Sequence, residues 1–199
     1  MRRSPLLACL LLCLGSCVTV GGSKTHEANL GPWVDASPSL QLKIDQQTQR
    51  LPWSHGIERI EIIQWFAEVG EPAYPVLLEL VLDPRSDVAG AALAALGATR
   101  DARLVEPLRE LPWPEEDAPD LALERARTLL RLGDWSMLPH LINGLEDERV
   151  MIRALCSQAL WEATHERFDY DANAPDAERQ ASIESWRAWW HEHQADPVR

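Results

Sequence analysis

The sequence is short of basic residues. Its 199 residues include 19 Lys and Arg against 31 Asp and Glu, a formal net charge of −12 at pH 7. Arg2 and Arg3 lie in a leader that we expect to be removed, and the first 16 residues contain no acid, so the remainder carries 17 basic against 31 acidic residues, or −14. Nucleic-acid binding needs clustered cations that replace the counterions of the phosphates. This shortage disfavours nucleic acid as a partner, and it also disfavours a basic patch for anionic lipid.

The sequence also has no long apolar run, which makes a transmembrane anchor the weaker interpretation of its start. The run from Leu6 to about Val20 is shorter than the roughly 18–20 residues that a spanning helix needs. It follows a basic start and ends in small residues, which is the pattern of an export signal. Its end, Leu14-Gly15-Ser16-Cys17, resembles the lipobox of bacterial lipoproteins.

The lipobox resemblance implies that residues 1–16 are cut off and that Cys17 is acylated on its thiol and on its new amino group. Several acyl chains anchor a protein stably, whereas one chain does not. Val18 stands where an Asp would signal retention in the inner membrane, so the resemblance favours the outer membrane, on its periplasmic side. The alternative is ordinary cleavage nearby, which leaves a soluble exported protein.

Cysteines for a disulfide framework are lacking as well. Cys9 and Cys13 belong to the leader, and Cys17 would be lipidated, which leaves only Cys156. Stability must therefore come from packing, although an exported protein resides in an oxidising compartment. Cys156 takes a small-residue position of an expected helix, so we interpret it as a buried structural thiol.

Sustained strand alternation is absent, and from about Gly56 the hydrophobic pattern is helical, beginning with a broad apolar face of Ile57, Ile60, Ile63 and then Trp65 and Phe66. Pro75, Pro107 and Pro139 follow one another at intervals of 32, each early in a short apolar segment. Proline is tolerated in a first helical turn because its missing N–H has no partner there. A second apolar pattern recurs at twice this interval, and three glycines are expected to end helices. The recurring residues are Val88, Ala92, Ala95 and Leu96, then Ile152, Cys156, Ala159 and Leu160; the glycines are Gly70, Gly97 and Gly133.

These features resemble the short HEAT repeat, which also occurs in bilin-lyase-like proteins. In that repeat, a first helix with an early Pro is followed by a turn such as Leu82-Asp83-Pro84 and by a second helix that begins Val-Arg. Residues 56–165 carry the resemblance, with a degenerate middle repeat that contains an insert at 112–117. The resemblance implies an all-α fold, a short solenoid of about three helix pairs, and a pairing of Arg153 with Asp147. A bundle of unrelated helices is the alternative.

The chain is expected to divide into three parts. Residues 1–16 are the signal peptide, 17–54 are the lipidated Cys and a flexible tether, and 55–195 are the repeat domain. Within the tether a short helix fits Ser39–Gln49, and its docking is left open. A Trp-rich helix at 178–190 places Ile183, Trp186 and Trp190 on one face, as expected of a C-terminal helix that caps the last repeat.

Motifs for catalysis and metal binding are lacking. The sequence has no Gly-rich phosphate loop, Ser nucleophile elbow or paired-Cys zinc spacing. Three residues, Asp169, Asp171 and Asn173, copy the first ligand positions of an EF-hand loop, but Ala174 and Gln180 replace the Gly and Glu that complete it. We therefore expect no metal and no cofactor.

Two His-containing pairs add no catalytic site. His191 and His193 lie two residues apart and do not share a helix face. Glu162 and His165 lie three apart on one face, and we interpret them as a surface pair. The sequence therefore indicates that the protein is not an enzyme, although the bilin-lyase resemblance keeps a lyase-like activity as an alternative.

A repeat surface and unusually many tryptophans remain as candidate binding features. Glu124, Arg127 and Arg131 form one polar face of the second helix of the middle repeat, and we expect them to contact a protein partner; a solvated face is the alternative. Trp33, Trp53 and Trp113 follow prolines in loops. They would suit a glycan or peptidoglycan binder if exposed, whereas such residues more often fix a loop onto the core.

Taken together, these patterns predict a lipid-anchored, non-enzymatic protein-interaction or scaffold module of the bacterial cell envelope. The inference from fold to function is by analogy, because one fold can support many functions.

Overall fold

A computed structural model of the chain describes residues 33–114 and 118–195. Over these ranges the chain is all-α, as the sequence predicts, and forms nine α-helices. The helices are α1 (Pro38–Arg50), α2 (Gly56–Val69), α3 (Tyr74–Leu80), α4 (Ser86–Thr99), α5 (Val105–Glu110), α6 (Pro119–Arg131), α7 (Leu138–Gly144), α8 (Val150–Thr164) and α9 (Asp176–His193). Four short 3-10 turns lie between these helices. The turn η1 (Leu51–Trp53) directly follows α1, and η2 (Glu71–Ala73), η3 (Ala102–Leu104) and η4 (Trp135–Met137) directly precede α3, α5 and α7.

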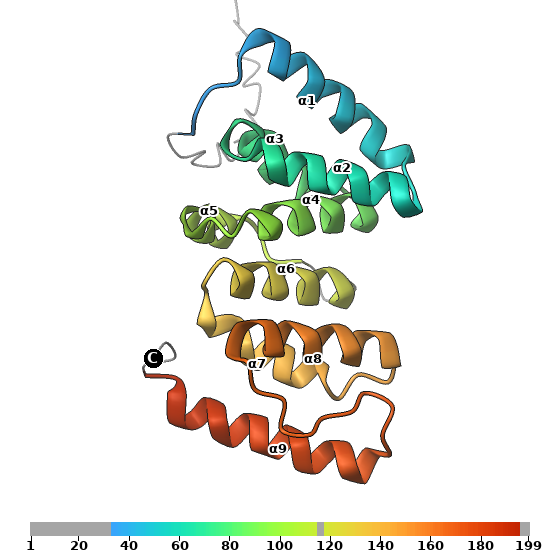
Figure 1. Cartoon of the computed structure of the whole chain (residues 1–199), viewed down its shortest axis with the longest axis vertical. Coiled ribbons are helices and arrows are strands. Elements are labelled where there is room, and N and C mark those ends of the chain that lie inside the picture. The colour runs from blue at the N-terminus through green and yellow to red at the C-terminus, as the bar shows by residue number, and fades with distance from the viewer. Residues whose placement is uncertain (1–32, 115–117, 196–199) are drawn as a thin grey trace, which may run out of the picture.

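Neighbouring helices pack on one another along the long axis of the molecule, from α1 at one end to α9 at the other (Figure 1). Helix α4 packs between α2 and α6, and α6 in turn packs against α8. The shorter helices α3 and α7 pack against α4 and α8, and α9 packs against α7. The four long helices α2, α4, α6 and α8 therefore adjoin one another in chain order.

The three evenly spaced prolines lie where the sequence places them, in the first turn of a helix. Pro75 and Pro139 are the second residues of α3 and α7, and Pro107 is the third residue of α5. Each of these helices directly follows a 3-10 turn. Because a first-turn N–H has no intrahelical acceptor, proline starts each helix without the loss of a hydrogen bond.

Two of the three glycines expected to end helices do so. Gly70 (φ +68°) and Gly133 (φ +103°) lie just past α2 and α6, in backbone conformations that glycine adopts without strain. The prediction for Gly97 was wrong, because Gly97 lies inside α4, which ends at Thr99. A Cβ at position 97 would lie 3.3 Å from the hydroxyl oxygen of Thr128, so the glycine allows α4 and α6 to approach closely.

The hydrophobic core consists of two clusters that meet at α6. Leu129 belongs to the cluster formed with α1 to α5, and Leu130 belongs to the cluster formed with α7 to α9. The hydroxyl of Thr128 donates to the carbonyl oxygen of Leu93 at 3.0 Å, which links α6 to α4 within the core. Helix α6 thus joins the two halves of the described structure.

Residues 33–54, which we grouped with the tether, contribute to the first cluster. The short helix expected at 39–49 is α1, and its docking is now visible because Ile44 and Leu51 are buried. Trp33 packs edge-on against Tyr74, with 4.9 Å between the ring centroids. The signal peptide, Cys17 and the rest of the proposed tether lie outside the described residues.

The C-terminal helix buries the stripe that the sequence predicts. Ile183 and Trp186 are buried in the second cluster, and Trp190 packs against it half-buried. Phe168, from the loop between α8 and α9, contacts the ring of Trp186 edge-on at 4.8 Å between centroids. This aromatic pair fixes the loop before α9 onto that helix, while α9 itself packs against α7.

Candidate functional site

The predicted partner-contact residues lie together on α6, and their charges are already paired. Arg127 donates to Glu124 at 3.2 Å within the helix, and Arg131 donates to Glu162 of α8 at 2.8 Å. All four side chains are between 17 and 23 % exposed. Burial raises the pKa of Glu162, but the hydrogen bonds from Arg131 and Gln158, together with the charges of Arg131 and Arg127, outweigh burial and leave this pKa below its usual value. The stripe is therefore a half-buried ion-pair network that connects α6 with α8.

The expected surface pair of Glu162 with His165 is not formed. The carboxylate of Glu162 accepts bonds from Arg131 and from Gln158, the latter at 2.8 Å. His165 follows α8 with φ +61°, and its ring lies edge-on to Trp161. His165 thus lies past the end of the regular helix, and no hydrogen bond or ion pair joins its ring to the carboxylate of Glu162.

Arg125, on the same helix, is a functional candidate that the sequence reasoning missed. Its side chain is 1 % exposed and donates to three carbonyl oxygens, of Leu108, Leu111 and Pro112. Burial lowers the pKa of Arg125 to about 10, so the group remains a cation at pH 7. These carbonyls lie at and just past the end of α5, where helix carbonyls lack intrahelical donors and favour a cation. The only sequence signal was a charged residue within an otherwise apolar stripe.

Arg153 of α8 has a similar role, and it does bond its predicted partner Asp147, but at the backbone carbonyl and not at the carboxylate. Its guanidinium donates to the backbone carbonyls of Asp147, Glu148 and Ala172, at 2.7 to 2.9 Å. The carboxylate of Asp147 instead accepts from Arg149. Arg153 thus ties the turn before α8 to the loop before α9 without a salt bridge to Asp147.

A second polar cluster joins η4 to α5. Arg109 donates to both carboxylate oxygens of Asp134, each at 2.7 Å, and the Ser136 hydroxyl donates to the same carboxylate at 2.6 Å. Burial raises the pKa of Asp134, but these hydrogen bonds outweigh burial, so its pKa lies below the usual value. Because the carboxylate of Asp134 accepts from both Arg109 and Ser136, it holds η4 against α5.

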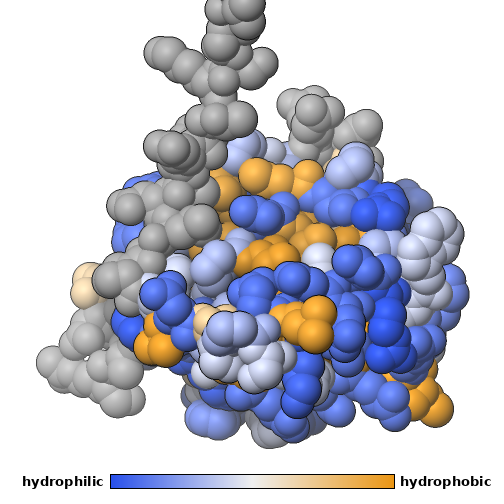
Figure 2. All heavy atoms as spheres, turned by 90° about the horizontal axis from the view of Figure 1, so that it is seen from above, coloured by the Kyte–Doolittle hydropathy of each residue, from blue (hydrophilic) through white to orange (hydrophobic). Residues whose placement is uncertain are grey.

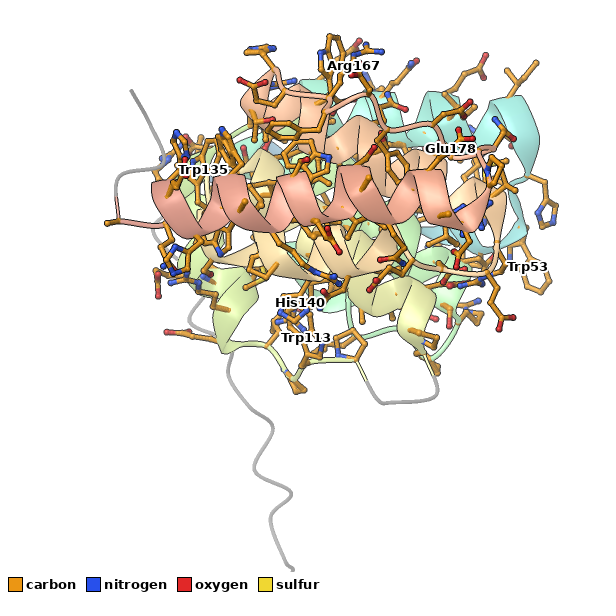
Figure 3. The ribbon with its side chains drawn as sticks, turned by 90° about the horizontal axis from the view of Figure 1, so that it is seen from below. Trp53, Trp113, Trp135, His140, Arg167 and Glu178 are labelled. Atoms are coloured by element: carbon orange, nitrogen blue, oxygen red, sulfur yellow. The ribbon has the colours of Figure 1, made fainter. Side chains whose placement is uncertain are left out.

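The three proline-linked tryptophans have different environments. Trp33 packs on Tyr74 beneath the guanidinium of Arg103, and it therefore fixes a loop onto the core. Trp113 is 42 % exposed and lies between the ring of His140 and the guanidinium of Arg125; Figure 3 shows Trp113 beside His140. Trp53 is 80 % exposed, so it alone of the three presents most of its indole to solvent.

Exposed apolar side chains also occur at the end formed by α1 and α2. Leu42, Ile57 and Ile60 are exposed there, and Figure 2 shows apolar side chains among hydrophilic ones on this end. The apolar face expected at the start of this region is therefore wrong for Ile57 and Ile60 and correct for Phe66, which is buried, and for Ile63 and Trp65, which pack against the first cluster. The buried residues of α2 are Ile62, which the predicted face did not include, and Phe66, because the helix packs on α4.

The weak metal and thiol candidates have structural roles. The carboxylate of Asp171 accepts the backbone N–H of Asn173 at 2.8 Å, while Asp169 occupies a left-handed turn. Within residues 33–114 and 118–195, no three His, Cys, Asp or Glu side chains lie close enough together to hold a metal ion. Cys156 is buried, and burial raises the pKa of its thiol to about 12, which keeps it protonated and unreactive at pH 7.

None of the described helices is long and apolar enough to cross a bilayer. Neither a model of a protein family nor a curated protein matches the chain.

Proposed function

We propose that this chain is a lipid-anchored, non-enzymatic interaction module of the bacterial cell envelope, built as a short α-solenoid of HEAT-like helix pairs. The recurrence of helix starts supports the repeat. First helices begin at 74, 105 and 138, and second helices begin at 86, 119 and 150. Each first helix follows a 3-10 turn and carries a proline in its first turn.

One observation carries the proposal of a binding surface. The long helices α2, α4, α6 and α8 pack in chain order, so their outer sides adjoin, and α6 contributes Glu124, Arg127 and Arg131 there. Stacked repeats of this kind create extended surfaces for partners. We propose that a protein partner docks across α6 and α8 and uses the partly exposed guanidinium groups of Arg127 and Arg131.

The partner proposal is tested by crosslinking in intact envelopes followed by affinity capture of the full chain. The substitution Arg127→Glu reverses a charge at the centre of the stripe. The yield of crosslinks between the partner and residues of α6 and α8 should therefore fall at least about tenfold. Arg187→Glu, an exposed ion-pair residue of α9, is the matched control and should leave those crosslinks intact. Equal crosslinking by both variants and the unchanged chain would contradict the proposed surface.

The anchor proposal rests on Leu14-Gly15-Ser16-Cys17 and is tested separately. In cells grown with an alkyne-tagged fatty acid, Cys17→Ala should remove the lipid label completely and release the processed chain from membranes, because no acyl chain remains to partition into lipid. Cys13→Ala changes a nearby leader cysteine and should keep both the label and the membrane fraction. A label that persists in Cys17→Ala would show that the lipobox assignment is wrong.

A further inference from the structure

Trp53 lies in a cleft between the end of α1 and the start of α2. The cleft has a volume of about 480 Å³ and is lined by Gln46, Gln47, Gln49, Arg50, Trp53 and Glu58. Figure 3 shows Trp53 projecting from the edge of the molecule. The volume falls in the range of about 300–1,000 Å³ that is usual for sites of small molecules.

An ion pair fixes the polar wall of this cleft. Arg50 of α1 donates to Glu58 of α2 at 2.7 Å, and it also donates to the amide oxygen of Gln47 at 3.2 Å. These bonds use one carboxylate oxygen of Glu58 and the amide oxygen of Gln47. The amide N–H groups of Gln47 and the second oxygen of Glu58 are not used by them, so the wall offers both donors and acceptors.

The charges and groups of the cleft favour an uncharged, hydroxyl-rich ligand. The charges of Arg50 and Glu58 cancel, so the cleft attracts neither an anion nor a cation strongly. Hydroxyl groups both donate and accept, which matches a wall of amides and a carboxylate. The apolar face of an indole packs against C–H groups, which a pyranose ring presents on its faces.

We propose that the Trp53 cleft binds a neutral glycan, with one sugar ring stacked on the indole and its hydroxyls bonded to Gln47 and Glu58. This goes beyond the proposed interaction module and does not depend on the anchor. The other reading of an exposed Trp near Ile57 is insertion into a lipid surface. Three glutamines and an ion pair argue against it, because acyl chains cannot form hydrogen bonds with these groups.

The test is calorimetric titration of the full chain, in a detergent without sugar groups, with chitotetraose and cellotetraose as uncharged probes. At least one probe should bind at millimolar concentration, and Trp53→Ala should weaken binding by at least about tenfold. Trp53→Phe keeps a smaller aromatic ring, so its affinity for the probe should lie between that of the unchanged chain and that of Trp53→Ala. Gln47→Ala should also weaken binding, since it removes amide donors without touching the ring.

Trp113→Ala is the matched control, because Trp113 is also partly exposed but lies outside this cleft. The affinity of the Trp113→Ala variant for the sugar probes should equal that of the unchanged chain. Circular dichroism of each variant checks the fold. The proposal is overturned if neither probe binds, if Trp53→Ala binds a probe as tightly as the unchanged chain, or if Trp53→Ala reduces only the binding to phosphatidylcholine vesicles.

Discussion

Replacing Arg125 with Met should lower the free energy of unfolding by about 3 kcal/mol or more. Methionine keeps the apolar stem of the side chain but removes the donors to Leu108, Leu111 and Pro112. Each buried carbonyl left without a donor costs about 1–3 kcal/mol. The loss also frees the segment after α5, so the midpoint of urea unfolding, followed by circular dichroism, should fall markedly.

Arg127→Met is the matched control for this change, because it removes a cation two residues away on the same helix. Arg127 is partly exposed and pairs with Glu124, so its loss should cost under about 1 kcal/mol. Arg125→Lys keeps the charge but not the fork of donors, and its stability should fall between those of the unchanged chain and Arg125→Met. Equal losses from Arg125→Met and Arg127→Met would show that the carbonyl bonds contribute little.

Replacing Gly144 with Ala should destabilise the protein by about 1–3 kcal/mol, although alanine normally favours a helix. Gly144 ends α7, and an added Cβ would overlap the Sγ of Cys156 and lie 3.3 Å from Leu123. Relief of this overlap requires the Sγ of Cys156 to leave its place in the second core cluster, or α7 and α8 to separate. Thermal unfolding monitored by circular dichroism measures the effect.

Gly90 provides the opposite result within the same fold. An added Cβ at this position in α4 meets nothing within 4 Å, so Gly90→Ala should stabilise the protein by about 0.5–1 kcal/mol. Adding Cys156→Ala to Gly144→Ala removes the overlapping sulfur and should recover part of the loss. If Gly144→Ala raises stability as Gly90→Ala does, the close approach of α7 and α8 is not a constraint on packing.

Local features of the structure followed from the sequence because they depend on neighbours within one or two turns. A proline lacks one N–H wherever it lies, so the first-turn positions of Pro75 and Pro139 could be predicted. The stripe of Ile183 and Trp186 follows from the helical period alone. That Glu124 and Arg127 share one face of α6 also follows from a spacing of three residues on one helix.

Contacts between elements required the tertiary structure. Arg125 and Arg127 are two residues apart, yet one is buried against three carbonyls and the other is partly exposed in an ion pair. The partner of Arg131 is Glu162, 31 residues along the chain, so spacing within the helix could not identify it. Periodicity shows which residues share a face, but it does not show which element that face meets.

The tryptophans show the same division. Trp33 and Trp53 both follow a proline in the sequence, but Trp33 packs on Tyr74 while Trp53 borders an open cleft. The sequence by itself determined the all-α class and the helix starts at the spaced prolines, since each depends on local chemistry, and the lipid anchor stays a prediction of the sequence alone. Only the tertiary structure decided which cations are buried, which glycines allow helices to approach closely and which indole faces solvent, because burial depends on the packing of residues distant in the chain.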